Sequence, residues 1–174
     1  GLVEIFPRFF EDARGLFFES FNSNSFKELG IPHQFVQDNQ SFSHKGVLRG
    51  LHFQEAPFAQ GKLVRVVSGK VLDIALDIRP QSPTFGKHEA FLLDGIKHNM
   101  VYIPEGFAHG FVALEDTIFT YKCTNVYDKA SERGIRWDDE ELGIDWGITN
   151  PIISEKDNLL PSFREYFNEL SSVR

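Results

Sequence analysis

Short β-prone runs follow one another from about residue 33 to residue 127, and this succession limits what the chain can fold into. The runs are rich in β-branched and aromatic residues, and turn sequences such as "SGK", "RPQSP" and "PEG" separate them. The clearest of them cover residues 63–67, 71–78, 100–104, 110–114 and 118–123. Strands that are short and regularly spaced predict a sandwich or barrel rather than a βαβ fold.

Residues 71–78, "VLDIALDI", show the plainest alternation of the period-two kind. Leu72, Ile74, Leu76 and Ile78 fall on one face of a strand, and two aspartates and an alanine fall on the other. The chain also contains 18 phenylalanines, which suit the space between two sheets.

Two segments outside the β-prone region carry helix signals. In "SNSFKELG", residues 23–30, Ser25 and Glu28 have the spacing of a capping box, and Gly30 is suited to end the helix. In "PSFREYFNEL", which starts at Pro161, apolar residues recur at helical spacing after a proline that fits the first turn. We therefore expect one short peripheral helix and a C-terminal helix packed on a β-domain.

The chain has 174 residues, which is enough to bury a core, and we expect a single domain over 1–174. Its one cysteine, Cys123, excludes an internal disulfide and fits a reducing compartment. The sequence shows no signal-peptide pattern, and no apolar run approaches the roughly 18 residues that a membrane span needs. These features predict a cytoplasmic protein without a membrane partner.

The formal net charge of −7 argues against a nucleic-acid partner. Positive charge is nevertheless concentrated in residues 40–70, where five cations accompany one acid, Glu55. Those cations are Lys45, Arg49, Lys62, Arg65 and Lys70. One interpretation is a solvated face. Because three of the cations lie beside or inside apolar strand patterns, the other interpretation is a local site for an anion such as phosphate.

The stretch "GVLRGLHFQ", residues 46–54, places an arginine and a histidine three residues apart in a β-prone run. If Leu51 and Phe53 pack between two sheets, His52 faces the other way. If His52 lines a barrel interior instead, Arg49 and Leu51 face outward. Periodicity leaves both alternatives open, and it also leaves open whether His52 is a structural residue or a base.

Six histidines raise the question of a metal site. A metal needs three or four converging ligands, and no His-x-His pair supplies two of them from one strand face. His52, Glu105 and His109 are the set from which a triad could be assembled. We expect a site without a metal, and the alternative is a metal-dependent cupin oxygenase or isomerase.

Other polar residues have ordinary structural interpretations when each is taken alone. His109 in "PEGFAHGF" can be a surface residue of a turn, and Asp157 in "ISEKDNLLP" can be a capping acid. Tyr121 and Tyr127 can be plain strand residues. Together, a base, an orienting carboxylate, an acid and a lysine suit the removal of a proton next to a carbonyl and its replacement from the other face. That chemistry inverts a carbon centre without a cofactor.

Several long motifs, in one order, are similar to those of a known family. "GVLRGLHFQ", "QGKLVRVVSGKVLDIALDIR", "SPTFGK", "IPEGFAHGF" and "ISEKD" resemble the dTDP-4-dehydrorhamnose 3,5-epimerase family from about Val3 to Pro161. The resemblance implies an all-β, cupin-like jelly-roll sandwich or barrel with short peripheral helices and a C-terminal helix. It also implies a homodimer that acts on a thymidine-diphosphate (dTDP) 4-keto-6-deoxy sugar, inverts C3 and C5, and uses neither metal nor cofactor.

The resemblance carries four catalytic roles onto this chain. His52 is expected to take the proton at C3 and C5, and Asp157 to pair with it and hold its tautomer. Tyr121 is expected to deliver a proton from the opposite face, and Lys62 to stabilise the enolate at the C4 oxygen. The other matching residues are expected to contact the nucleotide, the diphosphate or the sugar. They are Arg14, Phe17, Glu19, Gln37, Asp38, Asn39, Arg49, His109, Tyr127, Glu132 and Lys156.

Two positions depart from the family pattern. His88 stands where the family carries an aromatic residue, and the stretch after Trp137 lacks a proline. Both lie away from the expected catalytic positions and bear on substrate preference. Related enzymes invert only C3 or move the keto group between C3 and C4, so the number of inverted centres stays open. A further alternative is a non-catalytic β-sandwich that binds a sugar nucleotide.

Overall fold

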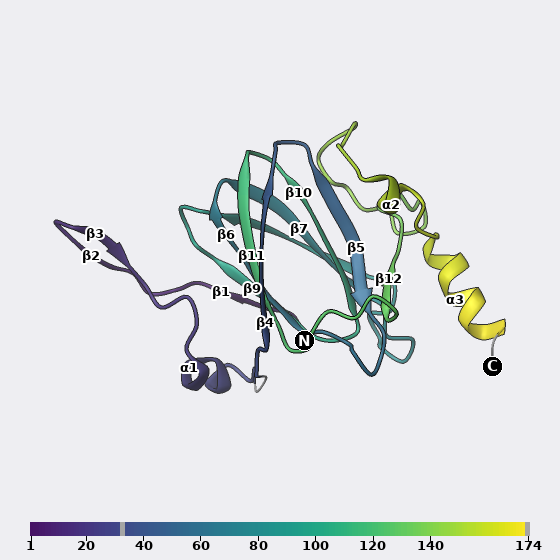
Figure 1. Ribbon diagram of the computed structural model, residues 1–174, viewed down its shortest axis with the longest axis horizontal. Coiled ribbons are helices and arrows are strands. Elements are labelled where there is room, and N and C mark those ends of the chain that lie inside the picture. The colour runs from purple at the N-terminus through teal and green to yellow at the C-terminus, as the bar shows by residue number, and fades with distance from the viewer. Residues whose placement is uncertain (32–33, 173–174) are drawn as a thin grey trace.

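The structure, a computed structural model, describes residues 1–31 and 34–172, so that His33 lies outside the described residues. Two five-stranded antiparallel sheets face each other (Figure 1). The first sheet has the order β1 (Val3–Ile5), β9 (Met100–Ile103), β6 (Lys62–Ser68), β11 (Thr117–Cys123) and β4 (Gln37–Ser43). The second sheet has the order β12 (Glu132–Gly134), β5 (Leu48–Gln54), β10 (Phe107–Ala113), β7 (Lys70–Asp77) and β8 (His88–Asp94). The predicted all-β, cupin-like sandwich is confirmed.

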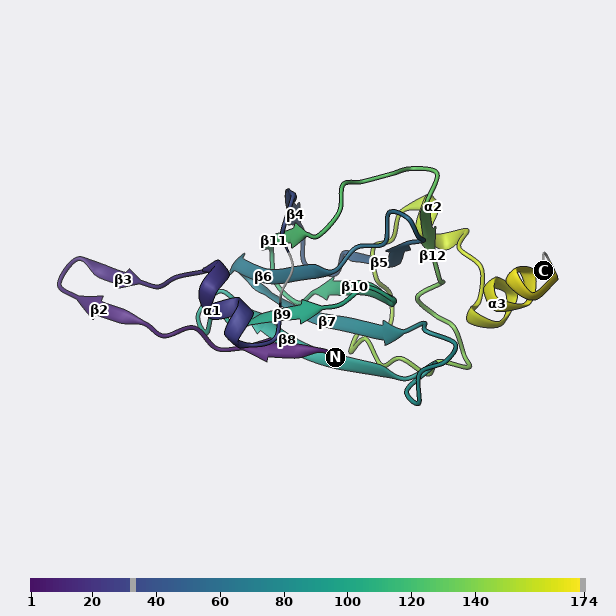
Figure 2. The ribbon, with the colours of Figure 1, turned by 90° about the horizontal axis from the view of Figure 1, so that it is seen from below.

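The five clearest β-prone runs of the sequence all coincide with strands, namely β6, β7, β9, β10 and β11. A separate two-stranded hairpin was not predicted. It pairs β2 (Phe10–Asp12) with β3 (Gly15–Phe17), and it projects from the body of the molecule as an arm (Figures 1 and 2).

The described helices are α1 (Ser23–Glu28), α2 (Glu155–Asn158) and α3 (Phe163–Ser172). The predicted peripheral helix is therefore present, but its capping box was placed wrongly. Asn22 caps α1 by accepting the N–H groups of Asn24 and Ser25, because the helix begins two residues before Ser25. The C-terminal helix is confirmed, and its last described turn ends at Ser172.

Each face of the second sheet packs into a separate core. One face turns toward the first sheet, where Ala75 and Phe111 pack with Phe119. The other face carries Leu51 and Phe53 and is covered by the segment from 135 to 167, which includes the first part of α3. The alternation predicted for 71–78 is therefore real, but both of its faces are buried.

The chain returns to β5 after passing over the second sheet. Ile152 forms a parallel bridge with Val47, and the Leu48 N–H donates to the Ile152 carbonyl at 3.0 Å. This pairing places the segment before α2 at the open edge of the sandwich, close to β4 and β5. Within the described part of the chain, no helix is long and apolar enough to cross a membrane.

Candidate active site

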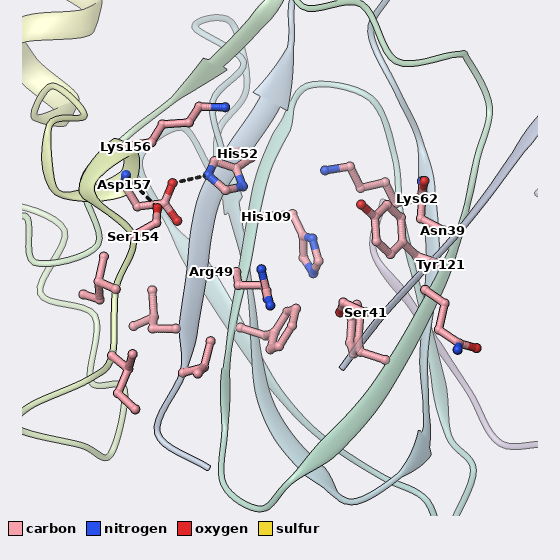
Figure 3. A pocket seen from close by; sticks show the side chains of 17 residues that line it. Asn39, Ser41, Arg49, His52, Lys62, His109, Tyr121, Ser154, Lys156 and Asp157 are labelled. Atoms are coloured by element: carbon pink, nitrogen blue, oxygen red, sulfur yellow. Dashed lines mark hydrogen bonds and ion pairs between the residues drawn. The ribbon is translucent and has the colours of Figure 1, made fainter. Parts of the chain in front are cut away.

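A cavity of about 580 Å³ opens between the two sheets, next to the segment that precedes α2. Figure 3 shows His52 and Asp157 on one side of it and Lys62 and Tyr121 on the other. Four more predicted residues also line it, namely Asn39, Arg49, His109 and Lys156. Residues that the sequence analysis assigned to catalysis and binding therefore meet in one place.

Arg49 and His52 both face this cavity, as the family resemblance had implied and neither alternative from strand periodicity had foreseen. Leu51 and Phe53 lie on the opposite face of the second sheet. In a regular strand, residues three apart point to opposite faces. The pairing of β5 with β10 changes register at this point, and the resulting β-bulge returns Arg49 to the face of His52.

His52 and Asp157 form a hydrogen-bonded pair, with 2.7 Å between the imidazole Nε2 and the carboxylate Oδ1. The Asp157 side chain is 5% exposed and that of His52 is 30% exposed, so the carboxylate is buried while the imidazole reaches the cavity. Burial would raise the pKa of Asp157. The hydrogen bond and charge of His52, together with the Gly50 N–H, outweigh that effect and hold the pKa below its ordinary value. An ionised Asp157 accepts the Nε2 proton and leaves Nδ1 free to act as a base.

Local structure fixes the position of Asp157. Ser154 caps α2, and its hydroxyl accepts the Asp157 N–H at 3.1 Å. Ile152, two residues before Ser154, is bridged to Val47, so the cap lies directly beside β5. The sequence analysis did not name Ser154, although its three-residue spacing from an acid is an N-cap signal that could have identified it.

Lys62 on β6 and Tyr121 on β11 face His52 from the first sheet (Figure 3). The Lys62 Nζ lies 6.0 Å from the centre of the Tyr121 ring. Burial lowers the pKa of Lys62, although the charges of neighbouring acidic groups oppose this shift. Burial raises the pKa of Tyr121, which keeps its phenol protonated. A proton donor and a desolvated amine therefore lie across the cavity from the imidazole.

His109 forms a second imidazole–carboxylate pair, with 2.7 Å between its Nε2 and the Oδ2 of Asp73. The two side chains are 8% and 0% exposed, which excludes the surface turn considered for His109. The other oxygen of Asp73 has no hydrogen-bond partner among the described residues. Asp73 was placed on one face of the strand 71–78 from the sequence, but no role in the site was predicted for it. The signal that could have identified Asp73 is the presence of an aspartate in a strand that is buried on both faces.

Five predicted binding residues are linked in a network beside the cavity. The Tyr127 hydroxyl donates to Glu132 Oε2 at 2.8 Å, and the Lys156 Nζ lies 2.7 Å from the same oxygen. Gln37 accepts the backbone N–H of Tyr127 at 2.8 Å and donates to Asn39 Oδ1 at 3.1 Å. Since Asn39 and Lys156 line the cavity, the network forms part of its rim.

Four other predicted binding residues do not line the cavity of this chain. The Asp38 carboxylate lies on the outer side of the first sheet and pairs with Lys122 at 2.9 Å. Arg14 and Phe17 belong to the projecting hairpin, and Glu19 follows it (Figure 2). Within a single chain, these four predicted binding residues therefore lie away from the cavity.

The described residues contain no group of three histidine, cysteine, aspartate or glutamate side chains placed to hold a metal ion. Each histidine that lines the cavity is instead bonded to one carboxylate. His88 and the stretch after Trp137, which depart from the expected pattern, do not line the cavity.

The arrangement suits proton transfer at a carbon next to a carbonyl group. The imidazole backed by a carboxylate is a base, the phenol opposite is an acid, and the ammonium can stabilise a negative oxygen. Arg49 adds a guanidinium group, whose Nε donates to the hydroxyl of Ser43 at 3.0 Å. A fixed guanidinium at the cavity wall suits an anionic group such as a diphosphate.

Comparisons with known proteins agree with this chemistry. The family model described as dTDP-4-dehydrorhamnose 3,5-epimerase matches residues 1–165. A dTDP-4-dehydrorhamnose 3,5-epimerase of Shigella flexneri is 54% identical over 153 residues, which are 87% of this chain and 84% of that protein. The crystal structure of the Bacillus anthracis enzyme of the same name, with TDP and PPi bound, has a TM-score of 0.92 and 43% identity, covering 93% and 94% of the two chains. The dTDP-6-deoxy-D-glucose-3,5-epimerase of Legionella pneumophila, in complex with dTDP-4-keto-L-rhamnose, has a TM-score of 0.92 and 45% identity, covering 97% and 91%.

Replacing Lys62 with methionine is expected to stabilise the fold while it removes the ammonium from the cavity. Methionine fills a similar volume and needs no hydration, so the cost of burying the charge disappears. We expect urea denaturation to show a gain of about 0.5–2 kcal/mol in the free energy of unfolding. Lys87→Met, at an exposed position, is the matched control and should change little. A less stable Lys62→Met protein would show that the surrounding acids stabilise the ammonium by more than burial costs.

Proposed function

This chain belongs to the dTDP-4-dehydrorhamnose 3,5-epimerase family and is an isomerase, and we propose that it inverts C3 and C5 of dTDP-4-dehydro-6-deoxy-D-glucose. The product is dTDP-4-dehydro-L-rhamnose. The observation that carries the proposal is one cavity in which the His52–Asp157 pair faces Tyr121 and Lys62. The Legionella pneumophila relative binds dTDP-4-keto-L-rhamnose, which supports this class of ligand.

The proposed reaction proceeds by proton transfers next to the C4 ketone. His52 removes a proton from the carbon through Nδ1, the electron pair moves to the C4 oxygen, and Lys62 stabilises the enolate. Tyr121 then delivers its proton to the opposite face of the carbon, which inverts the centre. C3 and C5 both adjoin C4, so the same groups serve both centres in turn. His52 and Tyr121 are reset by exchange with water, so each inverted carbon carries a hydrogen from the solvent.

We assign the nucleotide diphosphate to the cationic side of the cavity. Arg49 and Lys156 supply positive charge there, and the Arg49 Nε donates a hydrogen bond to the Ser43 hydroxyl. His109 lies between Arg49 and Lys62 in Figure 3, a position that supports contact with the sugar or the diphosphate. The thymidine is assigned to the rim that contains Gln37, Asn39, Tyr127 and Glu132.

A second copy of the chain completes the site in this proposal. The β2–β3 hairpin exposes Phe10, Leu16 and Phe17, which are 51%, 43% and 65% exposed, and such a cluster of apolar side chains marks a contact surface. Arg14 and Phe17 match the nucleotide-contact motif, yet they lie away from the cavity of their own chain. A homodimer in which each hairpin reaches the partner's cavity accounts for both observations.

The proposal extends to a single domain over 1–174, located in the cytoplasm. Cys123 is free and buried, which suits a reducing compartment. The acidic net charge of −7 supports the absence of a nucleic-acid partner. The proposed proton transfers use side chains of this chain alone, with no cofactor or metal.

Incubation with the substrate in D₂O is expected to place two solvent deuterons in the product, one at C3 and one at C5, as read by NMR and mass spectrometry. His52→Gln removes the base and should give a protein that incorporates none. His88→Gln, outside the cavity, is the matched control and should behave as wild type.

Each other outcome of the deuterium experiment points to a different function. One deuteron in the product would indicate an epimerase that acts at C3 alone. Substrate that binds but acquires no deuterium would indicate a sugar-nucleotide-binding protein without this activity. Activity that a chelator removes would indicate a metal-dependent cupin.

Mixed dimers test whether the hairpin serves the partner's site. Arg14→Ala removes a guanidinium from the hairpin and His52→Gln removes the base, so each homodimer should turn over poorly. In a mixed dimer, one site combines an intact His52 with an intact hairpin from the other chain, and we expect co-expression of the two variants to restore activity. Sedimentation equilibrium reports the dimer itself. A mixture no more active than the sum of its separate homodimers would contradict the exchange of hairpins.

A further inference from the structure

β5 carries one residue more than β10 at the point where both strands reach the cavity. His52 pairs with His109, and Arg49 pairs with Phe111. The two residues between these pairs on β5 oppose one residue on β10, Gly110. β10 keeps a regular register with β7 through this region, so the irregularity belongs to β5. This extra residue is the reason that Arg49 and His52 lie on the same face.

Two glycines make the bulge possible. A Cβ atom on Gly50 would lie 2.5 Å from the Gly110 Cα, and one on Gly110 would lie 2.7 Å from the Arg49 carbonyl oxygen. Gly50 also has a φ of +129°, a conformation that favours glycine. The backbones of β5 and β10 thus approach more closely than they would if either residue carried a side chain.

The bulge also directs a backbone donor at the catalytic pair. The Gly50 N–H donates to Asp157 Oδ2 at 3.2 Å, while Oδ1 lies 2.7 Å from His52 Nε2. The next residue, Leu51, keeps both of its backbone hydrogen bonds to Ile135, at 3.1 and 3.0 Å. The backbone pairing of β5 with Ile135 is therefore intact next to the bulge, and the Gly50 N–H is available to the Asp157 carboxylate.

We propose that Gly50 and Gly110 are positioning residues of the active site, and that they act through this bulge. The bulge sets the anion-binding Arg49 and the base His52 on one face. The Gly50 N–H holds one carboxylate oxygen so that the other meets the imidazole. That arrangement fixes the Nε2–H tautomer and presents Nδ1 as the base. The inference rests on the proposed function, in which His52 is the base.

A backbone ester separates the donor from the steric role of the glycine. Incorporating glycolic acid in place of Gly50 substitutes an oxygen for the N–H and adds no Cβ. A hydrogen bond to a charged group contributes enough to change kcat by about 10- to 100-fold. We expect kcat to fall within that range, while KM stays near its wild-type value because Arg49 is not moved. The ¹⁵N spectrum of His52 should change from one tautomer to a mixture.

Gly110→Ala tests the close approach of the two strands. Its Cβ would push against the Arg49 carbonyl, so we expect kcat to fall and KM to rise together. Gly95→Ala is the matched control, because its Cβ would lie 2.9 Å from the Ser68 Cα, away from the cavity. It should lower thermal stability to a similar degree and leave kcat and KM unchanged. If Gly110→Ala does not fold, the ester variant at residue 50 alone tests the positioning role.

The outcomes distinguish this inference from the proposed function. An ester variant with wild-type kcat and a single Nε2–H tautomer would overturn the positioning role, whatever the reaction is. A wild-type protein that incorporates no deuterium would instead overturn the proposed function. In that case the ¹⁵N spectra would still report whether Gly50 orients the pair.

Discussion

The hydrogen bond between His52 and Asp157 is the interaction on which the rest of this site depends, because it joins β5 to a segment that lies 105 residues further along the chain. Neither partner is in place by itself. The bridge between Val47 and Ile152 brings the returning segment to the edge of β5, and Ser154 then fixes the turn that carries the carboxylate. The Gly50 N–H, on β5, donates a further hydrogen bond to the Asp157 carboxylate. A pair assembled in this way has one orientation, which is what a base needs.

The two-sheet architecture explains how the proposed acid and the proposed base come to lie on opposite sides of one cavity. The second sheet supplies His52, α2 beside it supplies Asp157, and the first sheet supplies Tyr121 and Lys62. Facing sheets stand about 10 Å apart, which leaves room for a sugar ring when bulky side chains are absent from the gap. Elsewhere the same gap is filled by aliphatic and aromatic residues such as Val64 and Phe91, so the cavity is the unfilled end of the core. Polar side chains buried there are hydrogen-bonded to specific partners, as His109 is to Asp73.

Sequence periodicity predicted the sandwich because strand length and turn residues are local properties. It could not decide the face of His52, since a single bulged residue reverses the alternation and a bulge depends on the neighbouring strand. Asp73 was missed for a related reason, because alternation was present but the covering of both faces is a tertiary property. The cap of α1 was misplaced at Ser25 because Asn22, immediately before the helix, offered an equally good acceptor. The motif resemblance supplied Asp157, which spacing alone left as a capping acid, and it supplied hairpin residues whose use, in the proposed function, depends on a second chain.

In the proposed reaction, deprotonation and reprotonation take place on opposite faces of the same carbon. Tyr121→Phe in D₂O tests that claim directly, because it leaves the base and removes the acid. We expect recovered substrate to gain deuterium next to the ketone, at C3 or C5, returned by His52 to the face it came from, while almost no inverted product forms. Inversion at the wild-type rate would contradict the role of Tyr121, and a complete loss of exchange with the fold intact would contradict the division of the two steps between two residues.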